Sequence, residues 1–349
     1  MKKKVLALVL ASAMAASMAA CGSSSDTATE ESAAASEAAS EAAEETEESG
    51  EAAASTDYKI DVILKTTASE YWGYVMAGAK AASEELGVEV DVKGATSETA
   101  YDEQQNMIET DLNSGAYDAI VIAPLQGDQV ATLIAGTDTP IFAVDTNIDA
   151  PEVISFVGTG NVAAATQGGE KAVELAKEAG WEEIKAIEIA GVQGDQTNSE
   201  RMEGYAAGIN GAGGEFLEDE TQYADGVADK AVTAMEAIMQ KYPEGVAIIV
   251  ANNDDMASAA ARVAKADEAY ANTVFVGFDG NKAACESILA GGQTMSVTQN
   301  AYGMGYMVVE AALNYLNGEE QEAFIEAPAG TVDASNAEER METLAGYLE

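Results

Sequence analysis

The residues that could hold a small molecule stand at the ends of short apolar runs. Lys65 ends the run YKIDVILK, and the aromatic residues Tyr71 and Trp72 follow it in a chain with only 2 Trp and 6 Phe. Further runs end in polar or aromatic residues, namely Asp145, Asn253 with Asp254, and Phe278 with Asp279. Carboxylates accept hydrogen bonds, amides both donate and accept, and aromatic rings cover apolar surface. These residues are therefore the ones to inspect for a binding site.

Catalytic and metal chemistry finds little support in the composition. The 349 residues contain no His, which removes the commonest general base and the commonest metal ligand. Cys285 lies in the helix-like run NKAACESILAGG, where we expect a small buried side chain, because no His is present to activate it. GTGNVAAA lacks the third glycine of a nucleotide-binding turn, and NNDD lacks the spacing of a calcium loop. We expect no catalytic residue, no metal and no cofactor.

The chain is strongly acidic. It contains 17 Lys and Arg against 61 Asp and Glu, which gives a formal net charge of −44. Such a surface repels nucleic acid and anionic lipid head groups, and it keeps a protein soluble. We therefore expect no nucleic-acid partner. We also expect the protein to be a monomer.

The N-terminal segment has the features of an export signal. Three Lys at positions 2–4 precede the apolar stretch VLALVLASAMAASM, and small residues precede Cys21 in MAAC. This pattern is similar to the bacterial lipoprotein signal, in which residues 1–20 are removed and Cys21 is lipidated; ordinary cleavage beside an incidental Cys is the alternative. A diacylated Cys would anchor the protein to the outer side of the cell membrane without a spanning helix. Residues 21–56 lack aromatic and branched aliphatic side chains, so we expect a disordered acidic tether.

The remaining residues alternate between short apolar runs and longer amphipathic stretches. The pattern predicts helices over residues 71–86, 99–113, 129–135, 162–179, 200–211, 228–242 and 256–264, with strand-like runs between them. Strands that alternate with helices indicate parallel sheets covered on both faces, and the order restarts near residue 162. We therefore predict an α/β fold with two lobes. In such sheets ligands bind beyond the carboxyl ends of the strands, where the polar residues named above stand.

Several blocks of the sequence carry a resemblance to a known family. They are ILKTTASEYWGYVMAGAKAASEELGVEVDV, AIVIAPLQG, TPIFAVDTNID, SERMEGY, ANNDDMA, VFVGFDG and MSVTQNAYGMG, in this order. Together they resemble the extracytoplasmic sugar-binding proteins of ABC importers, of the ribose, allose and galactose type, over essentially all of residues 57–349. The ordered set of blocks, more than any single block, carries the resemblance.

The resemblance implies the type I periplasmic binding protein fold, in which a hinge of three segments joins two Rossmann-like lobes with parallel sheets. The crossovers would fall near residues 158–161, 298–301 and 327–331. The implied N-terminal lobe is residues 57–159 with 300–328, and the implied C-terminal lobe is residues 160–299 with 329–349. Related repressors begin with a DNA-binding helix pair, whereas this chain carries a signal and a tether.

The resemblance also implies a set of ligand-binding residues. Tyr71 and Trp72 would face the cleft as an aromatic pair, and Ser69 stands where ribose-binding members have a ligand-binding Asn. The other implied positions are Asp145, Arg201, Asn253, Asp279 and Gln299. We add Lys65, which would point from the end of the first strand into the cleft, and Phe278, which precedes Asp279.

These residues also have structural alternatives. Trp72 lies on the apolar stripe of its helix and could belong to the core. Ser69 is one possible helix cap, whereas Thr67 with Glu70 has the spacing of a capping box. Turn and cap roles suit the Asp and Asn residues at strand ends, a helix surface suits Arg201, and Phe278 could pack under its strand.

Two departures from the family pattern bear on the ligand. Thr146 follows Asp145 where ribose-binding members have an Arg, which speaks against ribose. The C-terminal lobe of family members often presents a second aromatic residue to the sugar. Here Gly226 stands near that place and Tyr223 stands a few residues early, so we expect an aromatic platform on one side only.

Four of the candidate residues are charged. Lys65 and Arg201 would balance Asp145 and Asp279 in a closed cleft. Because an uncompensated buried charge is costly, a balanced site suits a neutral ligand and disfavours phosphate or carboxylate groups.

These expectations favour capture of a neutral monosaccharide or polyol by hinge closure, followed by delivery to the permease of an ABC importer. No bond would be broken, so we expect no enzyme. A sensory protein that presents a sugar or an autoinducer-type signal to a receptor is one alternative. A sugar-modifying enzyme is another, with Asp145 and Asp279 as its paired carboxylates.

Overall fold

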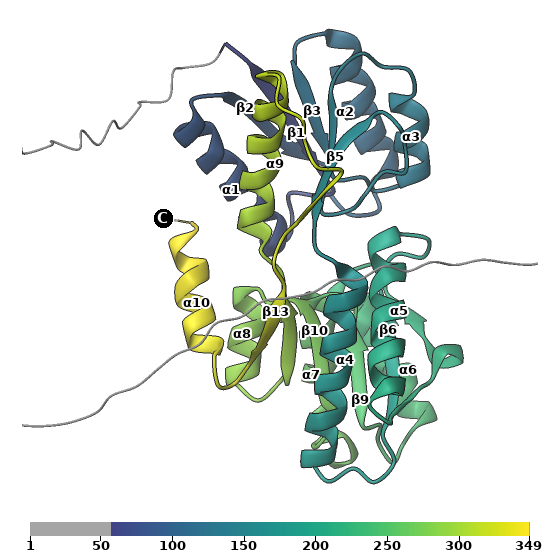
Figure 1. Cartoon of the computed structure of the whole chain (residues 1–349). Coiled ribbons are helices and arrows are strands. Elements are labelled where there is room, and N and C mark those ends of the chain that lie inside the picture. The colour runs from purple at the N-terminus through teal and green to yellow at the C-terminus, as the bar shows by residue number, and fades with distance from the viewer. Residues whose placement is uncertain (1–56, 349) are drawn as a thin grey trace, which may run out of the picture. The chain divides into compact units, whose positions relative to one another are not determined.

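The computed structural model describes residues 57–348, which form two α/β lobes connected by three chain segments (Figure 1). Cys21, the predicted signal and the predicted tether lie outside the described residues. Within the described part of the chain, no helix has the length and apolar character needed to cross a bilayer. The two-lobed α/β fold predicted from the alternation of strands and helices is confirmed.

The first lobe is built on a six-stranded sheet in which every pairing is parallel. The order β12-β5-β4-β3-β1-β2 comprises β1 Lys59–Leu64, β2 Glu89–Gly94, β3 Ala119–Ile122, β4 Ile141–Val144, β5 Val153–Gly158 and β12 Phe324–Glu326. One face is covered by α1 Glu70–Leu86 and α9 Ala301–Leu316, and the other by α2 Tyr101–Ser114 and α3 Gly127–Ile134.

The second lobe contains a seven-stranded sheet of order β13-β11-β10-β9-β6-β7, with β8 also paired to β6. Its strands are β6 Lys185–Ala190, β7 Glu215–Phe216, β8 Gln222–Tyr223, β9 Ile248–Ala251, β10 Val274–Asp279, β11 Met295–Thr298 and β13 Gly330–Asp333. Its helices are α4 Asn161–Glu178, α5 Gln196–Gly211, α6 Ala228–Lys241, α7 Asp254–Ala264, α8 Lys282–Leu289 and α10 Ala337–Gly346, with short 3₁₀ helices at Glu218–Glu220 and Glu268–Tyr270. Helices α4 and α5 cover one face of the sheet, and α6 and α7 cover the other.

The sequence pattern predicts parallel sheets, but the sheet of the second lobe contains one antiparallel pair. Strand β13 runs antiparallel to β11, with Thr298 opposite Gly330. Strand β11 ends at the hinge, and β13 starts there as the chain returns from the first lobe. A strand that begins where its neighbour ends has to run in the opposite direction.

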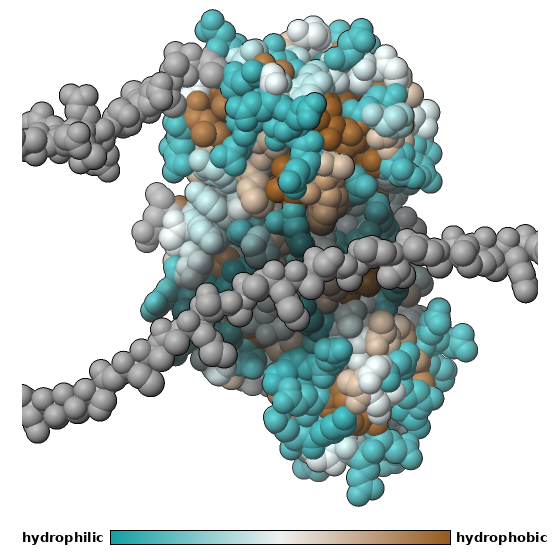
Figure 2. Space-filling model, in the orientation of Figure 1, coloured by the Kyte–Doolittle hydropathy of each residue, from teal (hydrophilic) through white to brown (hydrophobic). Residues whose placement is uncertain are grey.

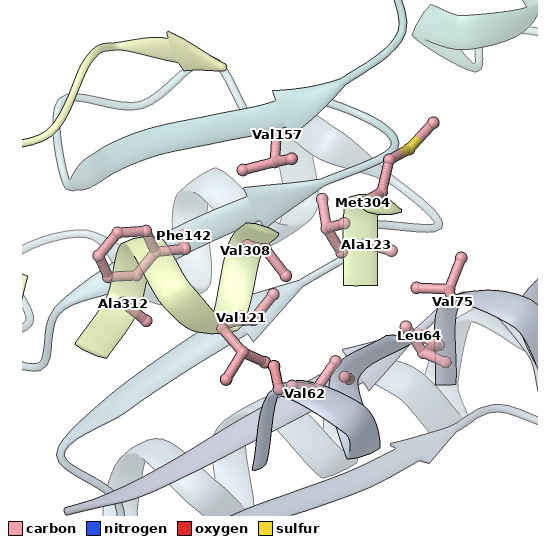
Figure 3. Close-up of a cluster of buried hydrophobic side chains, with 14 of the residues drawn as sticks. Val62, Leu64, Val75, Val121, Ala123, Phe142, Val157, Met304, Val308 and Ala312 are labelled. Atoms are coloured by element: carbon pink, nitrogen blue, oxygen red, sulfur yellow. The ribbon is translucent and has the colours of Figure 1, made fainter. Parts of the chain in front are cut away.

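The core of the first lobe explains the apolar run at its first strand. Val62 and Leu64 of β1 point toward α1 and α9, near Val75 and Val308, as Figure 3 shows. Ile63 points to the opposite face and packs with the cluster under α2 and α3. Because side chains alternate between the faces of a strand, a strand covered on both faces is apolar throughout. The hydrophilic residues spread over the visible surfaces of both lobes fit the acidic composition (Figure 2).

A side-chain cap sets the start of α1. The Oγ atom of Ser69 accepts a hydrogen bond from the backbone N–H of Trp72 at 3.5 Å, and Gly87 ends the helix in the left-handed region at φ 68°. Ser69 is therefore the cap, and the capping box of Thr67 with Glu70 does not form. The Glu70 carboxylate is engaged elsewhere.

Helices α5 and α7 are among those that begin earlier than the sequence pattern predicts. The Asp195 side chain caps α5 by accepting from the N–H of Asn198, and the Asn253 side chain caps α7 by accepting from the N–H of Met256. Helix α5 starts at residue 196 instead of 200, and α7 starts at 254 instead of 256. The first turns of both helices are polar, so the apolar pattern placed their starts too late.

The hinge consists of three short connections between the lobes. They are residues 159–160 between β5 and α4, residues 299–300 between β11 and α9, and residues 327–329 between β12 and β13. These positions agree with the predicted crossovers.

The C-terminal helix α10 contacts both lobes. Leu344 joins the apolar cluster of the first lobe, and Tyr347 stacks on Tyr302 of α9 with 4.3 Å between ring centroids. Arg340 donates hydrogen bonds to the backbone oxygens of Gly280 and Gln299, at 2.9 and 2.8 Å. The end of the chain thus packs against the N-terminal lobe and supports the hinge.

Candidate functional site

A cavity of about 260 Å³ lies between the two lobes, at the carboxyl ends of β1, β4, β9 and β10. Nine of the ten predicted ligand residues line it: Lys65, Ser69, Tyr71, Trp72, Asp145, Arg201, Asn253, Asp279 and Gln299. Phe278 does not. Parallel strands carry their carboxyl ends to the same edge of a sheet, so residues distant in sequence meet there.

The aromatic pair belongs to the cavity wall and to the core at once. The rings of Tyr71 and Trp72 meet edge to face, with centroids 5.2 Å apart and planes at 86°. Both residues join the apolar cluster of the first lobe, and only 7% and 2% of their surfaces are exposed. The Tyr71 hydroxyl donates to Asp145 Oδ2 at 2.7 Å, and Trp72 Nε1 donates to Glu98 Oε1 at 3.1 Å. The core and ligand interpretations of Trp72 are therefore compatible.

Two carboxylates of the cavity stand on unusual backbone conformations. Asp145 has φ 66° and Asp279 has φ 125°, a region that residues with a Cβ rarely occupy. Asp145 directly follows the buried strand β4, and Asp279 is the last residue of the buried strand β10, so both stand at the edge of the cavity. Backbone strain of this kind collects at functional sites, where it aims a side chain that regular geometry would direct elsewhere.

Lys65 forms an ion pair across the two lobes. Its Nζ atom lies 2.7 Å from Oδ2 of Asp195, the cap of α5, and both side chains are almost fully buried. Burial by itself would lower the pKa of Lys65, but Asp195, Asp145 and Glu98 together raise it above its ordinary value. The pKa of Asp195 is lowered, because Lys65 and the capped N–H of Asn198 outweigh its burial. Both members of the pair are therefore charged.

Arg201 is buried and held by several partners. Its Nε atom donates to Asn161 Oδ1 at 3.0 Å, and Nη1 donates to the backbone oxygen of Asn252 at 2.8 Å. Its guanidinium lies over the ring of Phe278, 3.8 Å from the centroid. Phe278 is fully buried beneath this guanidinium and does not reach the cavity, so its predicted role as a ligand-binding residue is wrong. Its ring packs against Arg201 and holds the guanidinium in place.

Asp279 lies in the same polar network. Its Oδ1 atom accepts from Gln299 Nε2 at 2.8 Å and lies 4.0 Å from Arg201 Nη1. Burial raises the pKa of Asp279 well above its usual range, against the opposing effect of Arg201 and with a further contribution from Asp254. Gln299 also accepts from the Thr159 hydroxyl at 2.9 Å, which ties two hinge segments together at the cavity.

Ser69 and Asn253 line the cavity while acting as helix caps. The Asn253 Oδ1 atom caps α7, and its Nδ2 donates to the backbone oxygen of Gly226 at 3.1 Å. Gly226 has φ 74°, and a Cβ added there would lie 3.4 Å from Oε2 of Glu98. Tyr223 is 45% exposed and is not part of the cavity lining. The aromatic wall is thus one-sided, as predicted.

The predicted charge balance of the cavity is wrong. Its lining contains two cations, Lys65 and Arg201, and six carboxylates: Glu98, Asp145, Asp195, Asp225, Asp255 and Asp279. Burial raises the pKa of Glu98, and the charges of Asp195 and Asp145 raise it further, whereas Lys65 lowers it. The additional carboxylates belong to loops and helix starts, whose positions the strand pattern of the sequence does not predict.

Several lining residues were missed at the level of sequence. Asn252 stands directly before the predicted Asn253, and Asp195 occupies a helix-cap position, so local signals for both were present. Glu98 lies in the loop after β2 and carries no pattern of its own. Thr197 enters through the first turn of α5, and its hydroxyl lies 2.7 Å from that of Thr146 in the other lobe.

Two α/β lobes, a hinge of three segments and a ligand-sized cavity between the lobes define a two-lobe binding protein. The family model described as "Periplasmic binding protein domain" matches residues 60–320, and the chain belongs to this family.

Known relatives agree with this assignment. The chain is 26% identical over 276 residues to the ribose import binding protein of Bacillus subtilis (strain 168), covering 78% of this chain and 86% of the relative. It is 30% identical over 265 residues to the D-allose-binding periplasmic protein of Escherichia coli (strain K12), covering 73% and 82%. A solved carbohydrate transporter solute binding protein from Agrobacterium radiobacter, in complex with D-arabinose, superposes with a TM-score of 0.73 at 28% identity, covering 82% and 98%.

Proposed function

We propose that this protein is the extracytoplasmic solute-binding component of an ABC importer and captures a monosaccharide or polyol between its lobes. One observation carries the proposal: the interlobe cavity joins an aromatic platform on one lobe to a rim of fixed hydrogen-bonding groups from both. Relatives named for ribose import and for D-allose binding support it, as does a neighbour solved with D-arabinose.

The arrangement of the cavity suits a ring that carries hydroxyl groups. Tyr71 and Trp72 offer apolar surface to C–H groups. Asp145 and Asp279 accept hydrogen bonds, whereas Arg201 donates them. A ligand that touches both lobes stabilises the closed arrangement over any open one, so binding and closure are coupled.

The charges of the cavity narrow the ligand class. Lys65 lies 2.7 Å from Asp195, and Arg201 lies 4.0 Å from Asp279. The other four carboxylates of the lining form no ion pair with a cation of the lining: Glu98, Asp145, Asp225 and Asp255. An anionic ligand such as a sugar phosphate or uronate would enter a field that repels it. We infer a ligand that is not an anion. Thr146 binds Thr197 and does not line the cavity, so no residue there takes the place of the Arg of ribose-binding members.

We further propose that the protein acts without chemical conversion of its ligand. Asp145 accepts from Tyr71 and from Thr146, and Asp279 accepts from Gln299. Carboxylates held by such donors suit the recognition of hydroxyl groups. Detection of a product from any sugar incubated with the protein would contradict this proposal.

The remaining proposals concern how the protein is placed and assembled. We propose a lipid anchor at Cys21, a tether over residues 21–56, a permease as partner and a monomeric state. The lobe boundaries stay as residues 57–159 with 300–328 and residues 160–299 with 329–349. Mass spectrometry of the membrane-extracted protein tests the anchor, because a diacylglyceryl Cys21 would appear as the first residue.

A thermal-shift screen tests the ligand class. It should include D-allose, D-ribose, D-arabinose, myo-inositol, glycerol and the furanosyl autoinducer, with glucuronate and a hexose phosphate as anionic controls. We expect the unfolding temperature to rise with at least one neutral sugar or polyol and with neither anion. A response to amino acids or nucleosides alone would overturn the proposal.

A further inference from the structure

The first turn of α1 serves two parts of the molecule. Ser69, Tyr71 and Trp72 line the cavity, whereas Glu70 does not. Successive helical residues point about 100° apart, so one turn can address two surfaces. The Glu70 carboxylate reaches the other lobe instead. It accepts hydrogen bonds from the backbone N–H groups of Lys282 and Ala283, at 3.1 and 3.2 Å.

These two N–H groups stand at the beginning of α8. The first N–H groups of any helix have no partner within the helix, and negative charge is favoured near them. Asn281, the local cap of α8, accepts from the third group, the N–H of Ala284, at 2.8 Å. The first two are satisfied by Glu70, from the opposite lobe. The start of α8 is therefore fully capped only while the lobes are in contact.

The carboxylate of Glu70 is held in place on its own lobe. The Tyr74 hydroxyl, one turn further along α1, donates to Glu70 Oε1 at 2.6 Å. The Tyr74 ring is buried and meets the ring of Tyr347 edge to face, with centroids 6.5 Å apart. Little further ordering of the carboxylate is needed when α8 approaches, which favours the contact.

We propose that Glu70 is a positioning residue for ligand capture: it latches the lobes together through α8 and raises affinity without touching the ligand. The inference rests on the proposed function of ligand capture between the lobes. When the lobes separate, the hydrogen bonds between the Glu70 carboxylate and the two N–H groups are replaced by hydrogen bonds to water. The latch is therefore made only in the closed arrangement and stabilises that arrangement alone. Ligand and latch then stabilise the same arrangement from the two sides of one helical turn.

Other contacts between the lobes do not allow so clean a test. The Lys65–Asp195 ion pair and the Thr146–Thr197 hydrogen bond are buried at or beside the cavity. A change in either would alter the ligand site itself. Glu70 and Lys282 lie outside the cavity lining, so changes there report on closure.

Two substitutions break the latch from opposite lobes. Glu70→Gln removes the charge of the acceptor, and Glu84→Gln, at an exposed position of the same helix, is its control. Lys282→Pro removes the N–H that donates to Glu70, and Lys282→Ala controls for loss of the Lys side chain. Proline is well tolerated at the first position of a helix. The preceding Asn281 has φ −76° and ψ 171°, the extended conformation required before Pro.

The first measurement needs no ligand. Trp72 is 2% exposed in the cavity wall, so separation of the lobes should open it to a quencher. In a common Trp181→Phe background, we expect acrylamide to quench Trp72 more strongly in Glu70→Gln and Lys282→Pro than in either control. An increase in Glu70→Gln alone would overturn the proposal, since Glu70 would then act only on its own helix. Equal quenching in all four variants would overturn it as well.

The second measurement is the affinity for D-allose, by calorimetry with stopped-flow dissociation. We expect both latch variants to bind about three- to tenfold more weakly, mainly through faster dissociation, because a contact made only in the closed state delays opening. High salt should narrow the deficit of Glu70→Gln by screening the wild-type carboxylate. Unchanged dissociation in both variants would overturn the proposal. If no sugar binds the wild type, the proposed function fails, while quenching still decides the latch.

Discussion

The two lobes bring unequal chemistry to the cavity between them. The N-terminal lobe contributes Tyr71 and Trp72, which also belong to its apolar core. The C-terminal lobe contributes Arg201, Asn253 and Asp279, all engaged in hydrogen bonds or ion pairs, and none of its described lining residues is aromatic.

Because of this difference, substitutions in the two lobes should have different effects on ligand affinity and on the stability of the fold. A binding residue that is also a core residue cannot be changed without disturbing the fold, because its burial is part of the free energy of folding. A binding residue in a polar network at a strand end can be changed with smaller structural consequences. The N-terminal lobe therefore offers a rigid platform, and the C-terminal lobe offers the groups through which specificity can be altered.

The largest effect is expected at Asp279. Asp279→Ala removes the acceptor of Gln299 Nε2, which we propose also accepts from a ligand hydroxyl. It should weaken sugar binding at least about 100-fold, since truncating one partner in a buried polar network that contains Arg201 costs about 3 kcal/mol. Calorimetry with a sugar from the screen measures this loss. Asp219→Ala, exposed in the same lobe, is the control. Unchanged affinity would show that Asp279 does not bind the ligand.

Trp72 tests the opposite lobe. Trp72→Ala should lower the free energy of unfolding by about 3 kcal/mol, because a large buried ring is lost, and should weaken binding at the same time. Trp72→Phe should lie between wild type and Ala in both respects. Denaturant unfolding gives the stability. If binding is lost in Trp72→Ala while stability is retained, the coupling inferred for this lobe is wrong.

A buried acid in the second lobe sets a pH dependence. Glu188 of β6 has no hydrogen-bond partner, and burial raises its pKa from 4.5 to about 8, with Arg201 opposing. Between pH 4.5 and about pH 8, the Glu188 carboxyl group is therefore protonated in the folded state and ionised in the unfolded state. Stability should therefore fall as pH rises from about 4.5 to 8, by roughly 2 to 4 kcal/mol.

Glu188→Gln should remove this loss. It should match the wild type near pH 4.5 and exceed it in stability at pH 8, as measured by denaturant unfolding across that window. Glu183→Gln, at an exposed position just before the same strand, should leave the pH profile unchanged. Parallel pH profiles for Glu188→Gln and wild type would rule out the effect.

The smallest effect is expected at the cap of α1. Ser69→Ala should lower the free energy of unfolding by about 1 kcal/mol through loss of the hydrogen bond to Trp72 N, and Thr67→Ala should change it little. Thermal unfolding distinguishes the two. A larger loss in Thr67→Ala would restore the capping-box interpretation. Sugar affinity that falls tenfold in Ser69→Ala would give Ser69 a ligand role beyond capping.

Part of the site could be predicted because several of its residues stand at the ends of buried strands. Apolar runs that end in Lys65, Asp145 and Asp279 mark strand ends, and parallel topology gathers these ends at one edge. Phe278 was misassigned for a related reason: it is the last apolar residue of β10, and the alternation of the strand directs its ring beneath Arg201.

The sequence by itself determined the two-lobed α/β fold, and its resemblance to a known family added the positions of the crossovers and several of the nine predicted residues that line the cavity. The fold could be predicted because strands and helices leave local patterns, such as apolar runs and amphipathic stretches, that extend over a few residues. Only the tertiary structure decided the pairing of Lys65 with Asp195, the entry of Glu98 into the cavity and the contact of Glu70 with α8. Such contacts depend on how segments that are distant in sequence meet in space. A charged residue that is exposed on a loop has the same local sequence features as one that is buried against the other lobe, so the sequence cannot distinguish them.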